Sequence, residues 1–515
     1  MMRRSICCLP ALGLSALLLV PEALALPFDE ARELVRRHMA EKNVPGLAVA
    51  VWQDGKVRWE EGFGWADVEN RVPATEHTMF NLASLSKTMT ATGVMTLAQA
   101  GKVDIDRPAN DYLGPDRITV HVGDPREVTV RRIANHTSGL AAGDQFFYGD
   151  EAAALPTMSE VIRRYGVVLD APGERYRYSN IGYGILGQLI EQVSGRRYED
   201  FMRLEVFLPL GMTRSAMNVP PGLGKYQAVR YDYDRKPLPF YVSAEPASAS
   251  IYSSAHDLAR FGLFFLKSPQ AGQRAILSEA SIDRMMGDAI ATQSSPVRTA
   301  GPDESGYAFG WVVSYHGGYR AFGHSGSTSG VNSELVLVPS QKMGFILLGN
   351  ADGSVSSLKE PLMKILLRKW REPAQRVAEA GPASAVPAPE LIGEWEGSVR
   401  TPEGDQSMKL TVLPGGDVHV SIGEPGRPGR STLRQPALLN EVKFDGGVRG
   451  TTLAQIQTSD TRRHPHTVSL DLRLRDGVLC GSALAASVFD DRWIYALPHW
   501  AELRREGVVQ EGAAQ

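Results

Sequence analysis

The hydrophobic pattern near the start of the chain predicts a helix followed by a β-hairpin. Residues 28–42 (FDEARELVRRHMAEK) place apolar side chains near helical spacing, and Asn43-Val44-Pro45-Gly46 ends the helix. Residues 46–52 and 57–64 are rich in β-forming side chains. Asp54-Gly55 between them supplies the positive-φ residues that a tight hairpin turn needs. We therefore expect two antiparallel strands behind one helix.

A second pair of apolar runs occurs much later, at residues 330–338 and 343–348. Residues 358–370 (LKEPLMKILLRKW) follow as an amphipathic helix able to cover one face of a sheet. The long stretch between the two hairpins has mostly helical periodicity, as in residues 182–193 and 255–266. This order of strands, helical insert and strands predicts an α+β fold, in which an antiparallel sheet is flanked by the terminal helices.

Beyond this fold, the composition changes twice. Four prolines lie among Ala and Glu in residues 371–390, which is typical of an extended linker. Short alternating runs separated by Gly-rich turns then predict a small all-β barrel or sandwich; they are residues 409–413, 418–422, 467–474 and 478–484. The predicted organisation is a first domain at 26–371, a linker at 372–390, a β domain at 391–505 and a tail at 506–515.

Length and composition agree with two folded domains. A chain of 515 residues exceeds what one core usually serves, and 43% hydrophobic with 22% charged residues is ordinary for a globular protein. The formal net charge is −3, and Lys and Arg are spread along the sequence. A nucleic-acid partner is therefore not expected, because phosphate backbones require a basic stripe.

The first 25 residues predict a signal peptide. Arg3 and Arg4 supply positive charge, residues 6–20 are mostly apolar, and Ala23-Leu24-Ala25 offers small residues for cleavage. The alternative is a buried or anchoring helix. It is disfavoured because prolines and a glycine interrupt a run that is already short for the roughly 20 residues of a bilayer span. We expect export to the periplasm or the exterior, with no stable membrane span after cleavage.

Candidate chemistry begins at Ser84-Leu85-Ser86-Lys87, at the start of a predicted helix that continues to Ala100. Positions three apart share a helix face, so the Ser84 hydroxyl and the Lys87 amine can meet. A serine hydroxyl keeps its proton at neutral pH, and a neighbouring amine can accept that proton if its own charge is disfavoured. The alternative is an ordinary helix start with Ser84 as its cap.

A second candidate is Tyr178-Ser179-Asn180, which precedes an apparent helix at residues 181–195. A loop that enters a helix can present a phenol and an amide to a cleft. Tyr178 could then move a proton, and Asn180 could hold a substrate carbonyl. The alternative is structural, since such side chains in turns often satisfy only local backbone groups.

A third candidate is Gly323-His324-Ser325-Gly326-Ser327, ahead of the late hairpin. Glycines let a substrate approach a strand backbone closely, and the backbone amides of Ser327 and Ser84 could form an oxyanion hole. The alternative is a Gly/Ser-rich loop with one solvated histidine.

Taken together, the order of these elements resembles the three motifs of the serine β-lactamase and D-alanyl-D-alanine carboxypeptidase superfamily, in particular class C β-lactamases. The resemblance covers residues 28–371. Further stretches add to it: Asn135-His136-Thr137-Ser138-Gly139-Leu140, Leu208-Pro209-Leu210-Gly211-Met212, residues 253–261 (SSAHDLARF) and residues 323–350 (GHSGSTSGVNSELVLVPSQKMGFILLGN). It implies a serine hydrolase that works through an acyl-enzyme and uses no metal or cofactor.

The resemblance also implies a role for each matched residue. Ser84 would be the nucleophile, Lys87 the proton acceptor, and Tyr178 the general base or acid during transfer. Asn180 would contact the substrate amide, and the Ser84 and Ser327 amides would bind the oxyanion. His324, Ser325 and Gly326 would line the strand side of the cleft, whereas His136 and Ser138 would be structural.

The sequence after the linker resembles lipocalin-like domains appended to this superfamily. The match is Leu391-Ile392-Gly393-Glu394-Trp395-Glu396-Gly397, which resembles their opening strand. The resemblance implies that this domain would shape or cap the mouth of the active site.

One departure from the family pattern leaves the identity of the acyl donor open. Class C β-lactamases carry Lys-Thr-Gly in the third motif, where the ammonium helps to bind a carboxylate, but here His324 replaces the lysine. A mostly neutral imidazole supplies less positive charge at pH 7, which disfavours an efficient β-lactamase. We expect a small-molecule or short-peptide substrate, first a peptide containing D-amino acids. The alternatives are a carboxylesterase, a weak β-lactamase and a non-catalytic muropeptide-binding protein.

Overall fold

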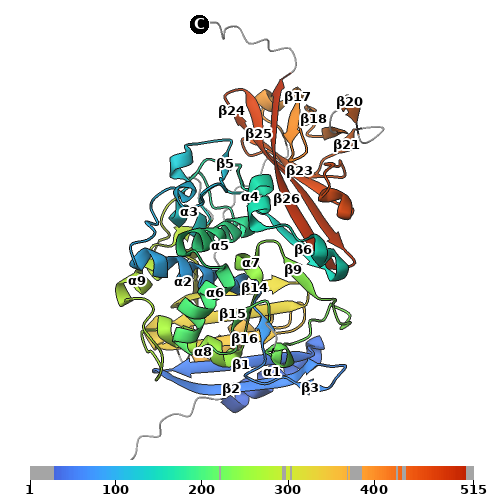
Figure 1. Ribbon diagram of the computed structural model, residues 1–515. Helices are drawn as coiled ribbons and strands as arrows, with labels where there is room; N and C mark the ends of the chain where they lie inside the picture. Colours follow the sequence, from blue (N-terminus) through green and yellow to red (C-terminus); the bar gives the residue numbers. More distant parts are fainter. Residues whose placement is uncertain are drawn as a thin grey trace, which may run out of the picture.

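The computed structural model describes residues 28–219, 222–292, 297–301, 304–367, 369–371, 386–424, 427–431 and 436–505. It has two parts, a sheet with a helical insert at one end and an all-β unit at the other (Figure 1). The predicted signal peptide, most of the predicted linker and the tail lie outside the described residues. In the part that the structure describes, no helix combines the length and apolar character needed to cross a bilayer.

Both predicted hairpins are confirmed, and they lie side by side in one antiparallel sheet. The order is β11-β12-β13-β14-β15-β16-β1-β2-β3, so the early hairpin meets the late one where β1 pairs with β16. Asp54 and Gly55 turn the first hairpin with φ of 51° and 75°. The strands are β1 Gly46–Gln53, β2 Lys56–Asp67, β3 Val72–Pro73, β11 Ile290–Ala291, β12 Gly306–Tyr307, β13 Val312–His316, β14 Tyr319–Thr328, β15 Val331–Val338 and β16 Met343–Gly349.

Strand β1 is apolar throughout because both faces of the sheet are covered. Leu47, Val49 and Val51 pack on one face with α1 (Phe28–Lys42) and α10 (Lys359–Leu366), whereas Ala48, Ala50 and Trp52 pack on the other face with the insert. The predicted helix at 28–42 is confirmed. The one predicted at 358–370 is shorter, since it ends at Leu366 and residues 369–371 are not helical.

The insert is mostly helical, as predicted, and its central helices are α2 (Ser86–Gln99) and α5 (Asn180–Ser194). Nearly every residue of α5 from Ile181 to Ile190 is buried, which explains its uniformly apolar sequence. The remaining helices and strands are α3 Val130–Ala134, α4 Met158–Tyr165, α6 Tyr198–Phe201, α7 Pro246–Ala249, α8 Ala255–Phe265, α9 Glu279–Gly287, β4 Phe80–Asn81, β5 Thr119–Val120, β6 Asp144–Tyr148, β7 Val167–Val168, β8 Ala216–Met217, β9 Tyr241–Ser243 and β10 Ile251–Ser253.

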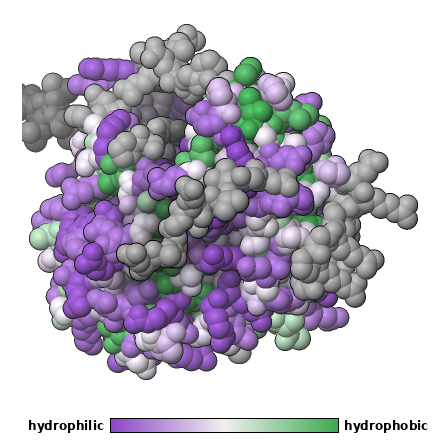
Figure 2. Space-filling view, turned by 90° about the horizontal axis from the view of Figure 1, so that it is seen from above, coloured by the Kyte–Doolittle hydropathy of each residue, from purple (hydrophilic) through white to green (hydrophobic). Residues whose placement is uncertain are grey.

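The C-terminal part is one curled antiparallel sheet in the order β20-β19-β18-β17-β26-β25-β24-β23-β22. This nearly closed sheet confirms the predicted all-β unit and the α+β class. Its strands are β17 Gly393–Arg400, β18 Gln406–Val412, β19 Val418–Glu424, β20 Arg427–Ser431, β21 Ala437–Leu438, β22 Asn440–Lys443, β23 Gly447–Thr452, β24 Thr467–Arg475, β25 Val478–Phe489 and β26 Arg492–Arg505. Seen from this end, the molecular surface is mostly hydrophilic, and apolar side chains gather in limited areas (Figure 2).

The two parts are joined by backbone pairing as well as by side chains. Strand β26 of the C-terminal sheet pairs with β6 of the insert, which in turn pairs with β9. The first of these pairings sets Ala496 opposite Asp144 and Tyr495 opposite Gln145. The C-terminal sheet therefore continues into the insert.

Candidate active site

Ser84 and Lys87 meet as their spacing predicts. Ser84 lies in a 3₁₀ turn, Ala83–Leu85, that leads directly into α2, and the Lys87 Nζ lies 3.1 Å from the Ser84 Oγ. Ala83 has a φ of 45°, a conformation that non-glycine residues rarely adopt and that is often found at functional sites. Ser84 has no capping hydrogen bond to the helix, so the cap interpretation is not supported.

The Lys87 amine is fully buried and surrounded by oxygen acceptors. Besides Ser84, it donates to the Asn180 Oδ1 at 2.7 Å and to the Ser248 carbonyl at 3.1 Å. Burial lowers the pKa of Lys87 to about 7, and the nearby Asp144 carboxylate opposes this shift only in part. A pKa near neutrality leaves both the neutral and the charged form of the Lys87 amine populated at pH 7.

The second motif enters the same site at the start of α5. Ser179 caps this helix by accepting from the Gly182 amide, which leaves the neighbouring Asn180 to contact Lys87. The Tyr178 ring centre lies 4.8 Å from the Lys87 Nζ. Burial raises the pKa of the Tyr178 phenol far above its ordinary value, although a hydrogen bond with Ser84 acts in the opposite direction.

His136 orders the loop in front of α5. Its Nδ1 accepts from the Ser179 amide at 3.1 Å, and its ring lies 4.3 Å from that of Tyr178. The side chain is 1% exposed. This placement agrees with the structural role expected for His136.

Strand β14 packs against the segment that carries Ser84. A Cβ on Gly326 would come within 2.0 Å of the Leu82 carbonyl oxygen, so only glycine permits this approach. The pairing of β13 with β14 ends where Val312 lies opposite Gly323. From His324 onward this edge of β14 has no strand partner among the described residues, which leaves backbone groups for an extended ligand.

His324 lies beside Tyr178, with 6.4 Å between their rings, but both of its nitrogens are already engaged. Its Nδ1 faces the Ser325 carbonyl, which can only accept, so the Nδ1 carries the proton and the Nε2 accepts from the Tyr307 hydroxyl at 2.9 Å. Burial lowers the pKa of His324 to about 3, and the positive charge of Lys87 adds to the effect. His324 is therefore neutral at physiological pH.

A cavity of about 370 Å³ opens onto Ser84. Ser84, Asn180 and Ser327 line it, whereas His324, Ser325 and Gly326 do not; His324 and Ser325 border a separate cavity of about 50 Å³ instead. The other lining residues are Asp144, Phe146, Tyr233, Ser248, Ala249, Thr328, Ser329, Asp352, Val488, Asp491 and Trp493. Chain regions remote from the three motifs, including the end of the C-terminal unit, therefore contribute to the cavity.

The sequence motifs do not include Asp144 and Trp493, which complete the polar network. The Asp144 carboxylate accepts from the Asn180 Nδ2 and from the Trp493 Nε1, each at 2.8 Å. The only local signal is a charged residue that opens an aromatic run, Asp144-Gln145-Phe146-Phe147-Tyr148, and this does not point to a site. Within the described ranges, no cluster of three His, Cys, Asp or Glu side chains is placed to hold a metal ion.

A serine backed by a buried lysine, between an antiparallel sheet and a helical insert, defines a serine hydrolase of the penicillin-binding class. The family model described as "Beta-lactamase" matches residues 31–368, and the chain belongs to this family. The family match agrees with the resemblance of the three motifs and covers nearly all of the first domain.

Several known proteins are similar to this chain. Penicillin-binding protein 4 of Amycolatopsis lactamdurans is 28% identical over 385 residues, which are 72% of this chain and 98% of that protein. Unguisins hydrolase ungD' of Aspergillus campestris is 27% identical over 345 residues, 63% of this chain. Protein flp of Staphylococcus aureus is 23% identical over 327 residues, 62% of this chain. The chain covers only 61% and 62% of the lengths of these last two relatives.

Solved structures share the fold. The octameric penicillin-binding protein homologue from Pyrococcus abyssi has a TM-score of 0.55 at 22% identity, and the match covers 93% of this chain and all of that one. A class C β-lactamase also has a TM-score of 0.55 at 22% identity, with 66% of this chain and 95% of that chain covered. The first likeness includes the C-terminal part of this chain.

Proposed function

We propose that this protein hydrolyses peptide or amide bonds in peptides containing D-amino acids, through an acyl-enzyme on Ser84. The observation that supports this most is the buried Lys87 amine, held 3.1 Å from the Ser84 hydroxyl with its pKa lowered to about 7. A group with a pKa near neutrality is populated in its base form at neutral pH, which suits a general base.

The partners of Lys87 orient its lone pair. A neutral amine has two N–H donors and one lone pair, and both the Asn180 Oδ1 and the Ser248 carbonyl can only accept. The two N–H groups therefore go to these oxygens, and the lone pair faces the Ser84 hydroxyl. Lys87 is positioned to take the Ser84 proton as the Oγ attacks the substrate carbonyl.

The reaction then balances as two transfers. In the first, the Oγ–C ester bond forms while the C–N bond breaks, and the departing amine takes the proton that Lys87 accepted. Tyr178 is the proton carrier on this path, because its raised pKa keeps it protonated and it contacts both Ser84 and Lys87. In the second transfer, water attacks the ester and Ser84 regains its proton.

The developing negative charge on the substrate oxygen needs hydrogen-bond donors. The Ser84 and Ser327 backbone amides are our candidates, since both residues line the cavity and β14 packs closely against the Ser84 segment at Gly326. Asn180 uses one N–H of its amide for Asp144, which leaves the other for a substrate carbonyl. Ser325 and His324 have no direct contact with substrate in this proposal.

Charge around the cavity supports a peptidase over a β-lactamase. Asp144, Asp352 and Asp491 line the cavity, and none of its described lining residues is Lys or Arg. His324 is neutral, so no cation stands where class C enzymes hold the carboxylate of an antibiotic. Neutral or amine-bearing acyl donors are favoured. An uncharged ester meets the same requirement, and a carboxylesterase is therefore the second candidate.

A labelling experiment tests the acyl-enzyme. Intact-protein mass spectrometry after treatment with a fluorophosphonate is expected to show one adduct, which Ser84→Ala abolishes and Ser86→Ala, two residues away, retains. An adduct that survives Ser84→Ala would refute the assignment. No adduct under any condition would favour a non-catalytic binding protein. Hydrolysis of D-alanyl peptides, p-nitrophenyl esters and a chromogenic cephalosporin then separates the substrate classes.

Export, the domain boundaries and the lipocalin-like character of the C-terminal unit are part of the same proposal. The family match ends at residue 368, which supports a boundary near 371, and the chemistry of an exported peptidase fits a signal peptide at 1–25. N-terminal sequencing of the mature protein tests the signal peptide. A mature protein that still carries residues 1–25 would exclude cleavage there.

A further inference from the structure

We infer that the C-terminal β domain is a working part of the active site, in which Trp493 is a positioning residue for the Asp144–Asn180–Lys87 network. This inference rests on the proposed function, since it assigns Lys87 the role of base. It goes beyond a domain that only caps the mouth of the cavity, because it connects that domain to the reacting proton.

An unbroken line of hydrogen bonds joins the two domains. The Trp493 Nε1, in β26, donates to the Asp144 Oδ1 at 2.8 Å, and the Asn180 Nδ2 donates to the Asp144 Oδ2 at 2.8 Å. The Asn180 Oδ1 then accepts from the Lys87 Nζ at 2.7 Å, and this amine lies 3.1 Å from the Ser84 Oγ. The two oxygens of Asp144 and the two ends of the Asn180 amide each serve one link, so no bond has to break for another to form.

The donor and acceptor chemistry of these four side chains fixes the direction of the hydrogen bonds at Asp144 and Asn180. A carboxylate only accepts and an indole only donates, so Asp144 fixes which end of the Asn180 amide faces Lys87. With the amide reversed, its N–H groups would face the N–H groups of Lys87, and the amine would lose an acceptor that keeps its lone pair toward Ser84. The hydrogen bond from Trp493 holds the Asp144 carboxylate in the position that fixes this orientation of the Asn180 amide.

The same carboxylate affects the charge of Lys87. Burial raises the pKa of Asp144, and the hydrogen bonds from Trp493 and Asn180 oppose that effect. The Asp144 charge in turn raises the pKa of Lys87. The other titratable groups that face these two residues are Glu245 beside Asp144, and Tyr178, Tyr183, His136 and His324 around Lys87.

Trp493 is itself held firmly by the first domain. Its backbone N–H donates to the Ser329 Oγ at 3.1 Å, and its carbonyl accepts from the Tyr148 hydroxyl at 3.0 Å. Two and three residues further on, Tyr495 and Ala496 pair with Gln145 and Asp144. The indole is thereby fixed in register with the carboxylate that it contacts.

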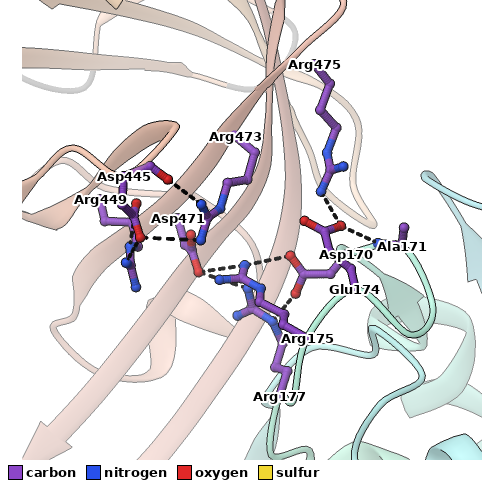
Figure 3. Close-up of polar contacts among 10 residues, drawn as sticks. All are labelled: Asp170, Ala171, Glu174, Arg175, Arg177, Asp445, Arg449, Asp471, Arg473 and Arg475. Carbon is purple, nitrogen blue, oxygen red and sulfur yellow. Dashed lines mark hydrogen bonds and ion pairs between the residues drawn. The ribbon is translucent and has the colours of Figure 1, made fainter. Parts of the chain in front are cut away.

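A second contact ties the β domain to the loop that carries Tyr178. Asp471, in β24, accepts from Arg175 and from Arg177, each at 2.9 Å, and both arginines also pair with Asp170 of the first domain (Figure 3). The Asp170 side chain is buried, yet the two arginines hold its pKa below the usual value. The β domain therefore contacts the first domain both at Asp144 and in the loop that leads to Tyr178.

Trp493→Phe tests the inference, because it removes the N–H donor and keeps an aromatic ring. We expect kcat to fall about tenfold, since a hydrogen bond to a charged group is lost, with KM for a small p-nitrophenyl ester nearly unchanged. Without its donor, Asp144 is protonated more often and raises the pKa of Lys87 less. The acidic limb of the kcat profile therefore moves to lower pH.

Trp500→Phe is the matched control. Trp500 lies in the same strand, is 4% exposed and stacks on His121 of the first domain, but it is absent from the cavity. We expect the control to keep the wild-type pH profile and kcat within about twofold. If Trp493→Phe gives the same profile and kcat as Trp500→Phe, the inference is overturned, while the fluorophosphonate adduct on Ser84 separately decides the proposed function.

If Trp493→Phe does not fold, a second variant tests the network. Asp144→Asn leaves an acceptor for the indole but removes the charge, so the acidic limb is expected to shift to lower pH in this variant too. An unshifted limb in Asp144→Asn would show that the network does not reach Lys87.

Discussion

The two walls of the cavity at Ser84 differ in origin and in environment. One wall carries Ser84 and Asn180, with the fully buried Lys87 behind them, and comes from the first domain. The second wall includes Val488 and Asp491 from the tip of the β25–β26 hairpin, where Val488 is 59% exposed. Burial makes the first wall reactive by disfavouring charge on the amine. The second wall is exposed to solvent and carries the charge of Asp491, which suits selection among substrates.

The reactive wall depends most strongly on the Lys87 amine. We expect Lys87→Ala to lower kcat about 10³-fold, because the general base is lost, while the melting temperature changes little or rises as a buried amine is removed. Steady-state kinetics and thermal denaturation measure the two effects. Lys102→Ala, on the exposed turn after α2, is the control and keeps wild-type activity. Near-normal turnover in Lys87→Ala would contradict the division between the walls.

Burial of the same amine also predicts a pH profile. Only the neutral form of Lys87 accepts a proton, so kcat/KM is expected to rise with pH and to level off above about 7. Below that value the rate falls about tenfold for each pH unit. A profile that is flat from pH 5 to 8 would show that Lys87 does not act as the base.

A charge introduced beside the reactive wall, at His324 next to Tyr178, tests why carboxylates are disfavoured. His324→Lys supplies the ammonium that class C enzymes hold in the third motif, and we expect about a tenfold gain in kcat/KM for a cephalosporin relative to a neutral ester. The added charge also lowers the pKa of Lys87, so the acidic limb moves to lower pH. His316→Lys, outside the cavity, serves as the control, and equal ratios in both variants would show that the charge at position 324 does not control carboxylate binding.

The smallest effect is expected on the exposed wall. Asp491→Asn is predicted to raise KM for amine-bearing acyl donors about two- to fivefold relative to their N-acetylated forms, and to leave kcat unchanged, because exposed charges are screened by water. The difference should shrink in high salt. Asp490→Asn is the neighbouring control, since Asp490 pairs with Arg492 and does not line the cavity. A loss of kcat in Asp491→Asn would place this residue on the reactive wall instead.

Much of the fold is predictable from local pattern. The helix at 28–42, the turn at Asp54-Gly55 and the late hairpin depend on periodicity and turn chemistry within a few residues, so they appear as expected. The helix predicted at 358–370 ends four residues early. Leu367 turns to an extended conformation there and packs against the sheet, a tertiary contact that periodicity does not encode.

The features of the candidate site also divide into those that local sequence predicts and those that only tertiary contacts produce. Ser84 and Lys87 are three residues apart on one helical turn, and the sequence alone indicates their contact. His324 carries a recognisable motif, but its neutral state and its contacts with Tyr307 and Ser325 follow from burial. No local rule brings Asp144 to the motifs or selects Trp493 among eight tryptophans.

The sequence by itself determined most strand and helix segments and the contact of Ser84 with Lys87, because each rests on residues close together along the chain. It also indicated the family, through the order of three such local motifs. Only the tertiary structure decided the pKa of Lys87, the neutral and fully hydrogen-bonded state of His324, and the contribution of the β domain to the cavity. The physical reason is that desolvation and contacts between remote segments depend on which surfaces meet. Asp144 and Trp493 are 349 positions apart in the chain and 2.8 Å apart in the protein.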